Sequence, residues 1–167
     1  MKAILSINKK IYRKLGKFIY LLSVVPQRIY GTHKQRSRVR ALILVDGNVL
    51  LVRNWLGMQR WTLPGGGAKR SETDQDALSR EVHEELGINI NSESWAFLGH
   101  FLQNDTPTPF TVNCFFITGA PDLKLQKPSH NHELIDASWF PVDALPKDSS
   151  LELKKARLLL QKRVKGQ

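Results

Sequence analysis

The residues best suited to chemistry form an acidic run near the middle of the chain. Glu81, Glu84 and Glu85 follow Arg80 in a segment whose apolar residues recur at intervals of three and four. This spacing predicts a helix, and at about 100° per residue the three carboxylates spread over roughly a third of its circumference. Glu85 falls beside Leu78, at the edge of the stripe that we expect to be buried.

Crowded carboxylates favour a bound cation. Like charges one helical turn apart repel by about a few tenths of a kcal/mol when exposed, and by more where water is excluded. Mg²⁺ and Mn²⁺ prefer oxygen ligands, and no Cys or His cluster in the sequence competes for a softer metal. We therefore expect Mg²⁺ (or Mn²⁺) on this helix, in an enzyme of phosphate chemistry.

The segment from Gly66 to Ile88 resembles the Nudix box, written G-x5-E-x7-R-E-U-x-E-E-x-G-U with U an apolar residue. Every fixed position is filled, by Gly66, Glu72, Arg80, Glu81, Val82, Glu84, Glu85, Gly87 and Ile88. The stretch that begins at Arg38 and ends in Trp61-Thr-Leu-Pro-Gly-Gly also looks like the strands around this box in Nudix hydrolases, as does the stretch that begins at Trp139.

The resemblance implies hydrolysis of the pyrophosphate bond in a nucleoside diphosphate linked to another moiety, such as a nucleotide sugar, an ADP-ribose-like compound or a nucleoside triphosphate. By resemblance, the metal ligands are the carboxylates of the box and the Gly66 carbonyl, that is Gly66, Glu81, Glu84 and Glu85. Arg80 would orient these carboxylates through charge-assisted hydrogen bonds. The general base is left open among Glu81, Glu85 and, outside the box, Glu133.

Simpler interpretations of the same residues exist. Glu-rich helices are commonly solvated faces, and Arg80 with Glu84 is an ordinary i,i+4 pair. Ser71 with Asp74 could be an N-terminal capping box and nothing more. The exact gaps of the box decide for the catalytic interpretation; the alternative is a catalytically weak Nudix scaffold that binds a ligand or is recruited to a membrane.

Substrate contacts are less well determined by the sequence. Trp61 could stack on a base, Arg53 and Lys69 could meet phosphates, and Glu72 and Glu133 are further candidates. Each of these side chains is explained equally well as part of the core or of the surface.

Length and composition fit one domain that must position the box. The chain has 167 residues, 41% of them hydrophobic, enough for a single core. Apolar runs predict strands over 39–45, 49–52, 61–63, 95–101, 110–117 and 137–142, and residues 151–164 predict a C-terminal helix. The first two strands should form a hairpin through the turn Asp46-Gly47-Asn48. Together with the box helix they predict an α/β/α sandwich with a mixed sheet. Cys114, the single cysteine, lies in a strand and excludes an intramolecular disulfide, which is compatible with a cytoplasmic protein.

The positive charge is concentrated in the first 40 residues. They hold eleven of the 25 Lys and Arg residues and no acid, so 14 basic residues face 15 acids in the rest of the chain. Apolar residues at helical spacing predict a basic amphipathic helix here, in an arm and linker over 1–36 (with the linker over 26–36) that precedes a Nudix domain over 37–167. Such a helix could lie on an anionic membrane through residues 1–25, or it could dock on its own domain or on a second copy of the chain. Nucleic acid is a less suitable partner, because few aromatic residues alternate with the basic ones. A short apolar stretch without a cleavage site argues against a signal peptide.

Overall fold

The computed structural model describes residues 11, 13–20, 22, 37–104, 109–119 and 134–166. In chain order the elements are β1 (Arg38–Val45), β2 (Asn48–Asn54), β3 (Trp61–Thr62), α2 (Asp74–Leu86), the 3₁₀ helix η2 (Ser92–Ser94), β4 (Ala96–Gln103), β5 (Phe110–Thr118), β6 (Leu134–Pro141) and α3 (Leu151–Lys165). Residues 13–20, with 11 and 22, form a further helix, called the N-terminal helix below. The predicted linker over 26–36 and Glu133 lie outside the described residues.

The strands form one mixed sheet, as the sequence predicts. Its order is β3-β2-β1-β5-β4, and β6 pairs with β2. β1 and β5 run parallel, and the other pairs are antiparallel. The predicted hairpin between β1 and β2 turns at Asp46 and Gly47, which both have positive φ angles (47° and 73°), as a tight two-residue hairpin turn requires.

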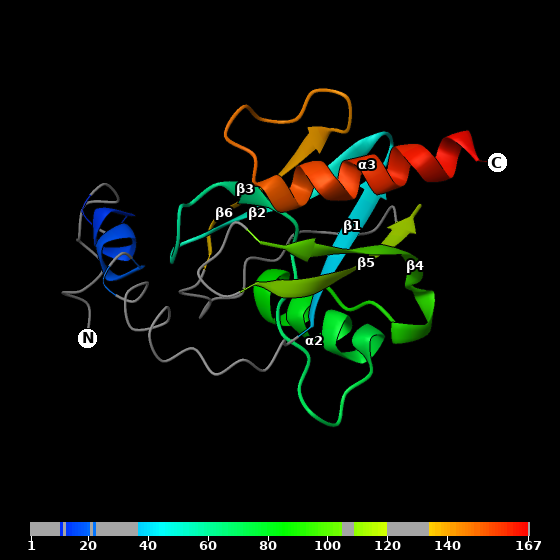
Figure 1. Ribbon diagram of the computed structural model, residues 1–167, viewed down its shortest axis with the longest axis horizontal. Coiled ribbons are helices and arrows are strands. Elements are labelled where there is room, and N and C mark those ends of the chain that lie inside the picture. The colour runs from blue at the N-terminus through cyan, green and yellow to red at the C-terminus, as the bar shows by residue number, and fades with distance from the viewer. Residues whose placement is uncertain are drawn as a thin grey trace.

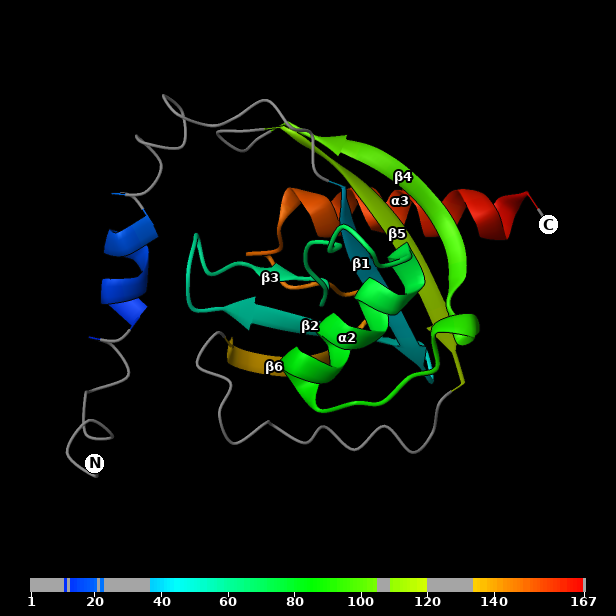
Figure 2. The same cartoon turned by 90° about the horizontal axis from the view of Figure 1, so that it is seen from below.

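Alternate residues of β1 supply two separate cores. One core lies between the sheet and α2 and includes Val39, Ala41, Ile43, Leu78 and Val82. The other lies between the sheet and α3 and includes Leu42, Leu51, Leu153 and Ala156. Figures 1 and 2 show the two helices on opposite faces of the sheet. The predicted α/β/α sandwich is therefore confirmed, with the period of two along a strand dividing the side chains between the layers.

The box helix α2 begins later than the capping box of the sequence would place it. Its N-cap is Thr73, whose hydroxyl accepts the Asp76 amide at 3.1 Å, so the assignment of Ser71 and Asp74 to the cap was wrong. The reason is local, since the Glu72 amide donates to the Lys69 carbonyl (3.2 Å) and closes a turn before the helix. The helix ends at Gly87, which has a φ of 69° and donates its amide to the His83 carbonyl at 2.8 Å.

The predicted N-terminal helix is present over the described residues and lies at the opposite end of the molecule from the C-terminal end of α3 (Figures 1 and 2). Among the helices of the described part of the chain, none has the length and apolar character needed to cross a membrane. The division into an arm over 1–36 and a domain over 37–167, and the cytoplasmic location, stay predictions.

Candidate active site

Arg80 holds three carboxylates of the box together. Its guanidinium donates to both oxygens of Glu72, from Nε at 2.7 Å and from Nη2 at 3.0 Å. Nη1 donates to Glu81 at 2.9 Å and to Glu84 at 3.1 Å, and Nη2 also reaches the Gly67 carbonyl at 3.2 Å. These partners raise the pKa of Arg80, with the hydrogen bond to Glu72 as the largest cause. One cation therefore ties the end of the glycine loop (Gly65 to Gly67) and the turn before α2 to the middle of the helix.

Glu72 closes the turn before the helix. The hydrogen bond from Arg80 lowers the pKa of Glu72 to about 2, and the Lys69 amide, which donates to the same carboxylate at 2.9 Å, acts in the same direction. Glu72 is thus a charged residue that stabilises the loop before α2 through Arg80 and the Lys69 amide. The Lys69 side chain is exposed. Both residues were predicted as substrate contacts, and that role stays a prediction.

Glu81 packs directly against the backbone of the glycine loop. A Cβ atom built on Gly66 would overlap the Glu81 carboxylate, so only glycine leaves room for that carboxylate here. The Gly66 carbonyl, predicted as a metal ligand, accepts the Val39 amide at 2.9 Å. A carbonyl oxygen has two lone pairs, and one of them is thus still compatible with a metal.

Glu85 is the buried member of the acidic run, with 6% of its surface exposed, as its place beside Leu78 predicts. Its carboxylate accepts the Gly65 amide at 2.9 Å. Gly65 has a φ of 126°, a conformation that side chains rarely adopt, and a Cβ there would overlap the Val39 carbonyl. Glu85 and the glycine loop therefore fix each other's position. From Glu85 through Glu81 to the exposed Glu84, the three carboxylates span the range from core to solvent.

A buried ion pair lies behind the glycine loop and was not predicted. Arg40 of β1 donates to Glu152 of α3, to the Gly65 carbonyl and, at 3.2 Å, to the Val39 carbonyl. The side chains of Arg40 and Glu152 are only 7% and 9% exposed. Burial alone would lower the pKa of Arg40, but Glu152 and then Glu85 raise it above its ordinary value. The sequence held a signal, because Arg40 interrupts an otherwise apolar strand, but not the identity of its partner.

The oxygen donors of the box suit a hard cation. In the part of the chain that the structure describes, no group of three or more His, Cys, Asp or Glu side chains is placed to hold a metal ion together. Glu81 and Glu84 instead face Arg80. Carboxylates and a backbone carbonyl are the ligands that Mg²⁺ and Mn²⁺ prefer, so the chemistry of the set fits these ions.

Arg53 and Trp61 lie together, as part of a packed cluster. The Arg53 guanidinium lies 4.5 Å from the centre of the Trp61 ring and donates to Asp148 at 2.7 Å. Trp61 is 7% exposed and meets the Phe140 ring edge-on, with 4.7 Å between ring centres. The structure thus favours the core interpretation of Trp61, and a contact of either residue with substrate stays a prediction. Glu133, the remaining candidate, lies outside the described residues.

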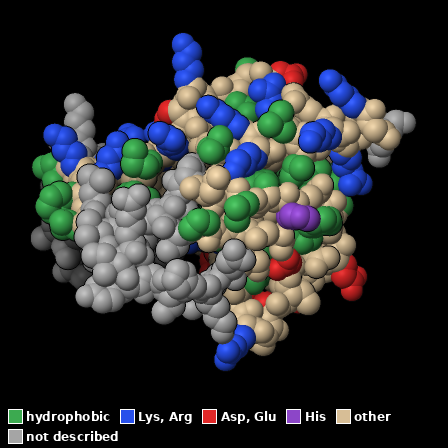
Figure 3. All heavy atoms as spheres, in the orientation of Figure 1, with side chains coloured by type: hydrophobic (Ala, Val, Ile, Leu, Met, Phe, Trp, Pro, Cys, Tyr) green, Lys and Arg blue, Asp and Glu red, His purple; other side chains and the backbone are tan. Residues whose placement is uncertain are grey.

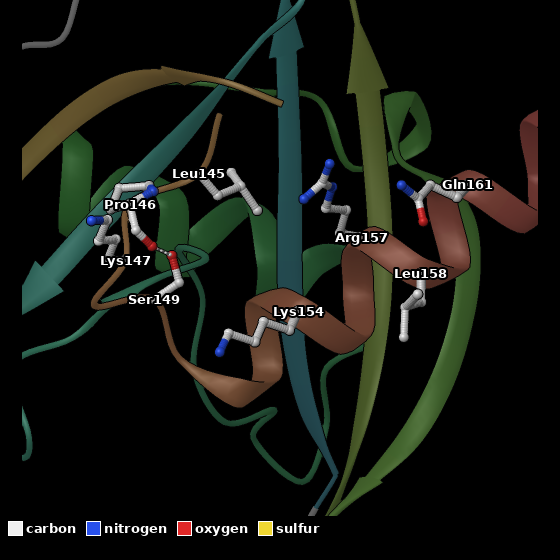
Figure 4. Close-up of a pocket in the computed structure, with 8 residues that line it drawn as sticks. All are labelled: Leu145, Pro146, Lys147, Ser149, Lys154, Arg157, Leu158 and Gln161. Atoms are coloured by element: carbon white, nitrogen blue, oxygen red, sulfur yellow. Dashed lines mark hydrogen bonds between the residues drawn. The ribbon is translucent and has the colours of Figure 1, made fainter. Parts of the chain in front are cut away.

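An open hollow of about 480 Å³ lies elsewhere, between α3 and the loop that follows β6. Figure 4 shows Lys147, Lys154 and Arg157 around it, with the Ser149 hydroxyl donating to the Pro146 carbonyl at 2.6 Å. None of the box residues lines this hollow, so it adds nothing to the candidate active site.

Comparisons with known proteins agree with the box and the fold. A family model described as NUDIX domain matches residues 34–163. The chain is 30% identical over 146 residues to the m7GpppN-mRNA hydrolase dcap-2 of Caenorhabditis elegans, across 83% of this chain and 16% of that protein. It is 34% identical over 95 residues to the nucleoside triphosphatase NudI of Escherichia fergusonii, across 54% and 60% of the two chains.

Solved structures share the fold at lower identity. The crystal structure of the MutT NUDIX hydrolase from Burkholderia pseudomallei matches with a TM-score of 0.65 and 23% identity, over 75% of this chain and 97% of that one. A MutT/nudix family protein from Enterococcus faecalis matches with a TM-score of 0.66 and 19% identity, over 100% and 75%. This chain covers less than two thirds of each curated relative described above.

Proposed function

Because the chain belongs to the Nudix family, we propose that it hydrolyses the pyrophosphate bond of a nucleoside diphosphate joined to another moiety, with Mg²⁺ or Mn²⁺ as cofactor. The observation that carries this proposal is the set of contacts within the box. Arg80 binds Glu72, Glu81 and Glu84 at once, and Glu85 binds the Gly65 amide. A merely solvated helix face has no need of contacts that join the helix to the loop before it.

The residues that would hold the metal are Glu81, Glu84, Glu85 and the Gly66 carbonyl. When bound, the metal neutralises phosphate oxygens and lowers the pKa of a coordinated water. Arg80 would orient Glu81 and Glu84 through its hydrogen bonds to them, and its two hydrogen bonds to Glu72 fix the guanidinium itself. This is the role that hydrogen-bonding partners of metal ligands generally have.

In the proposed reaction, a water oxygen forms a bond to one phosphorus and the bond from that phosphorus to the bridging oxygen breaks. The bridging oxygen leaves with the second phosphorus, so each product carries a new terminal phosphate group. A carboxylate takes the proton of the attacking water. Glu81 and Glu85 remain the candidates for this base within the box, with Glu133 outside it.

The substrate class is a nucleotide derivative, for which nucleotide sugars, ADP-ribose-like compounds and nucleoside triphosphates are the first candidates. The activities of similar proteins support this breadth. NudI is a nucleoside triphosphatase, and the chain is also similar to an RNA pyrophosphohydrolase of Teredinibacter turnerae (45% identical over 49 residues) and to the NAD-capped RNA hydrolase NudC of Vibrio parahaemolyticus (32% identical over 92 residues). RNA with a 5′-triphosphate or a cap therefore belongs in the same panel.

The test is product analysis by chromatography over that panel, with Mg²⁺, with Mn²⁺ and with a chelator. We expect metal-dependent release of a nucleoside monophosphate from one class and its loss, by about 10²-fold or more, in Glu81→Gln and in Glu85→Gln. Glu93→Gln, a change of the same chemistry at an exposed residue of η2, is the matched control and should retain full activity.

Three results would contradict the proposal. Turnover that survives the chelator argues against the metal, and turnover in Glu81→Gln or Glu85→Gln equal to that of Glu93→Gln argues against the box. Binding of a nucleotide without turnover across the panel would favour the ligand-binding alternative.

A further inference from the structure

The N-terminal helix contacts the domain through its smallest residue. Gly16 rests against Trp55 in the loop that follows β2, where a Cβ atom would overlap the Trp55 carbonyl. Beside it, Gln59 donates to the Arg13 carbonyl at 2.7 Å and accepts from the Arg13 Nε at 3.4 Å. Gln59 itself is 5% exposed. By the helical repeat Tyr20 lies on the same side, and it is half-buried. Among the residues that the structure describes, the docked side thus holds Gly16, Arg13 and Tyr20 and none of the exposed large apolar residues.

Those apolar residues are exposed instead. Five of them have between 39% and 61% of their surface in contact with solvent: Ile11, Leu15, Phe18, Ile19 and Leu22. Leu56 and Met58, in the same loop as Trp55 and Gln59, are also about half exposed at 48% and 57%. Soluble proteins rarely expose a contiguous apolar surface of this kind, and such surfaces commonly mark the site where a partner or a membrane binds.

The helical repeat explains this arrangement. At about 100° per residue, Ile11, Leu15 and Phe18 fall within roughly 60° of one another, with Ile19 and Leu22 in the same sector or at its edge. Gly16 and Arg13 lie more than roughly 100° from the centre of that sector. The docking contact thus turns the apolar face outward. The helix contacts its own domain, but this apolar face does not pack on it.

Charge identifies the partner. Lys14 and Lys17 are exposed on the helix between the docked side and the apolar face, and residues 1–40 contain eleven Lys and Arg and no acid. Hydrophobic and Lys or Arg side chains are seen together at the left edge of the molecule in Figure 3, where Figure 1 draws this helix. An apolar face bordered by lysines matches the interface of an anionic bilayer, where apolar side chains enter the acyl boundary and amines reach the phosphates.

We propose that the N-terminal helix attaches this protein to anionic lipid bilayers, through the apolar face of Ile11, Leu15, Phe18, Ile19 and Leu22 and the lysines beside it. Nucleic acid would use the lysines but leave five large apolar side chains in water. A second copy of this chain would bring two basic arms together, and their repulsion opposes such a contact.

The test is co-sedimentation of the full chain with vesicles of phosphatidylcholine alone and of phosphatidylcholine mixed with phosphatidylglycerol. The variant Ile11→Gln/Phe18→Gln removes apolar area and keeps charge and helix propensity. Leu158→Gln/Val164→Gln is the matched control, because these α3 residues are similarly exposed at 57% and 68%. Lys14→Gln/Lys17→Gln removes charge from the same helix.

We expect the wild type and the α3 control to bind the anionic vesicles, and binding to neutral vesicles to be weaker. Ile11→Gln/Phe18→Gln and Lys14→Gln/Lys17→Gln should each weaken anionic binding by about tenfold or more. Nucleotide hydrolysis without vesicles should be the same in all four proteins, so this test and that of the proposed function fail separately.

Several results would overturn the proposal. One is equal vesicle binding by the wild type and Ile11→Gln/Phe18→Gln, and another is no binding at all. A lipid-free dimer that Ile11→Gln/Phe18→Gln converts to monomer would assign the face to a second copy. Binding to single-stranded RNA that this variant weakens, without any vesicle binding, would assign it to nucleic acid.

Discussion

The buried pair between Arg40 and Glu152 allows a sharp prediction about stability. Removing one partner of such a pair leaves the other charge buried without compensation, which costs about 3–5 kcal/mol. Both side chains are more than nine-tenths buried, so solvent screening does not reduce this range appreciably. We expect Arg40→Met to lower the free energy of unfolding by about 3–5 kcal/mol, equivalent to roughly 10 °C in Tm for a domain of this size.

The double variant Arg40→Met/Glu152→Leu tests the cause. It leaves no unpaired charge, and apolar replacement of a buried pair is often neutral. It does leave the Gly65 carbonyl without its Arg40 donor, a loss of about 1–3 kcal/mol. The double variant should therefore be more stable than either single variant, although simple addition of the single effects predicts the opposite.

Urea unfolding followed by the fluorescence of the four tryptophans measures these differences. Asp148→Asn is the control, because it weakens an ion pair with Arg53 in which Asp148 is 53% exposed, and should cost less than about 1 kcal/mol. The reasoning is refuted if Arg40→Met costs no more than this control, or if the double variant is as unstable as the sum of the singles.

Two further predictions concern the box itself. Gly66→Ala should reduce hydrolysis by about 10²-fold, because the new methyl group displaces the Glu81 carboxylate. The urea midpoint should change little, since the flexible Glu81 side chain can move aside. Equal activity of the wild type and the variant would show that the position of Glu81 is unimportant. Glu72 should make stability fall in acid, because its pKa is lowered to about 2 in the folded protein, so its stabilising effect is complete above its ordinary pKa of 4.5 and is lost as pH falls through about 2. The urea midpoints of wild type and Glu72→Gln should thus differ near neutral pH and converge in acid, and a difference independent of pH would contradict the role of Arg80.

Features set by neighbours in sequence were predicted from the sequence. The box helix, the strands and the Asp46-Gly47 turn depend on spacing and on local backbone preferences, so their periodicity was sufficient. The helical repeat placed Glu85 beside Leu78 at the edge of the buried stripe, and in the structure Glu85 lies on the buried side of that edge. The cap at Thr73 was missed because two candidate capping residues compete within three positions, and the turn closed by Glu72 decides between them.

Features set by distant contacts were not predicted. Arg40 and Glu152 are 112 residues apart, and nothing in either segment names the other as its partner. The direction in which the apolar face of the N-terminal helix points depends likewise on Gly16 meeting the loop of Trp55. The spacing of apolar residues predicts a helix and its apolar face. Which side of the helix docks depends on Gly16, which lets the helix backbone approach the backbone at Trp55.

The same distinction explains why a local motif needs the whole sandwich. The amide of Gly65 is held by Glu85 of α2, and its carbonyl by Arg40, which is paired with Glu152 of α3. One residue of the glycine loop is thus held from both helical layers, directly by Glu85 of α2 and, through Arg40 of the sheet, by Glu152 of α3. A change in the packing of α3 should therefore reach the carboxylates of α2 through Gly65, although α3 contributes no residue to the box.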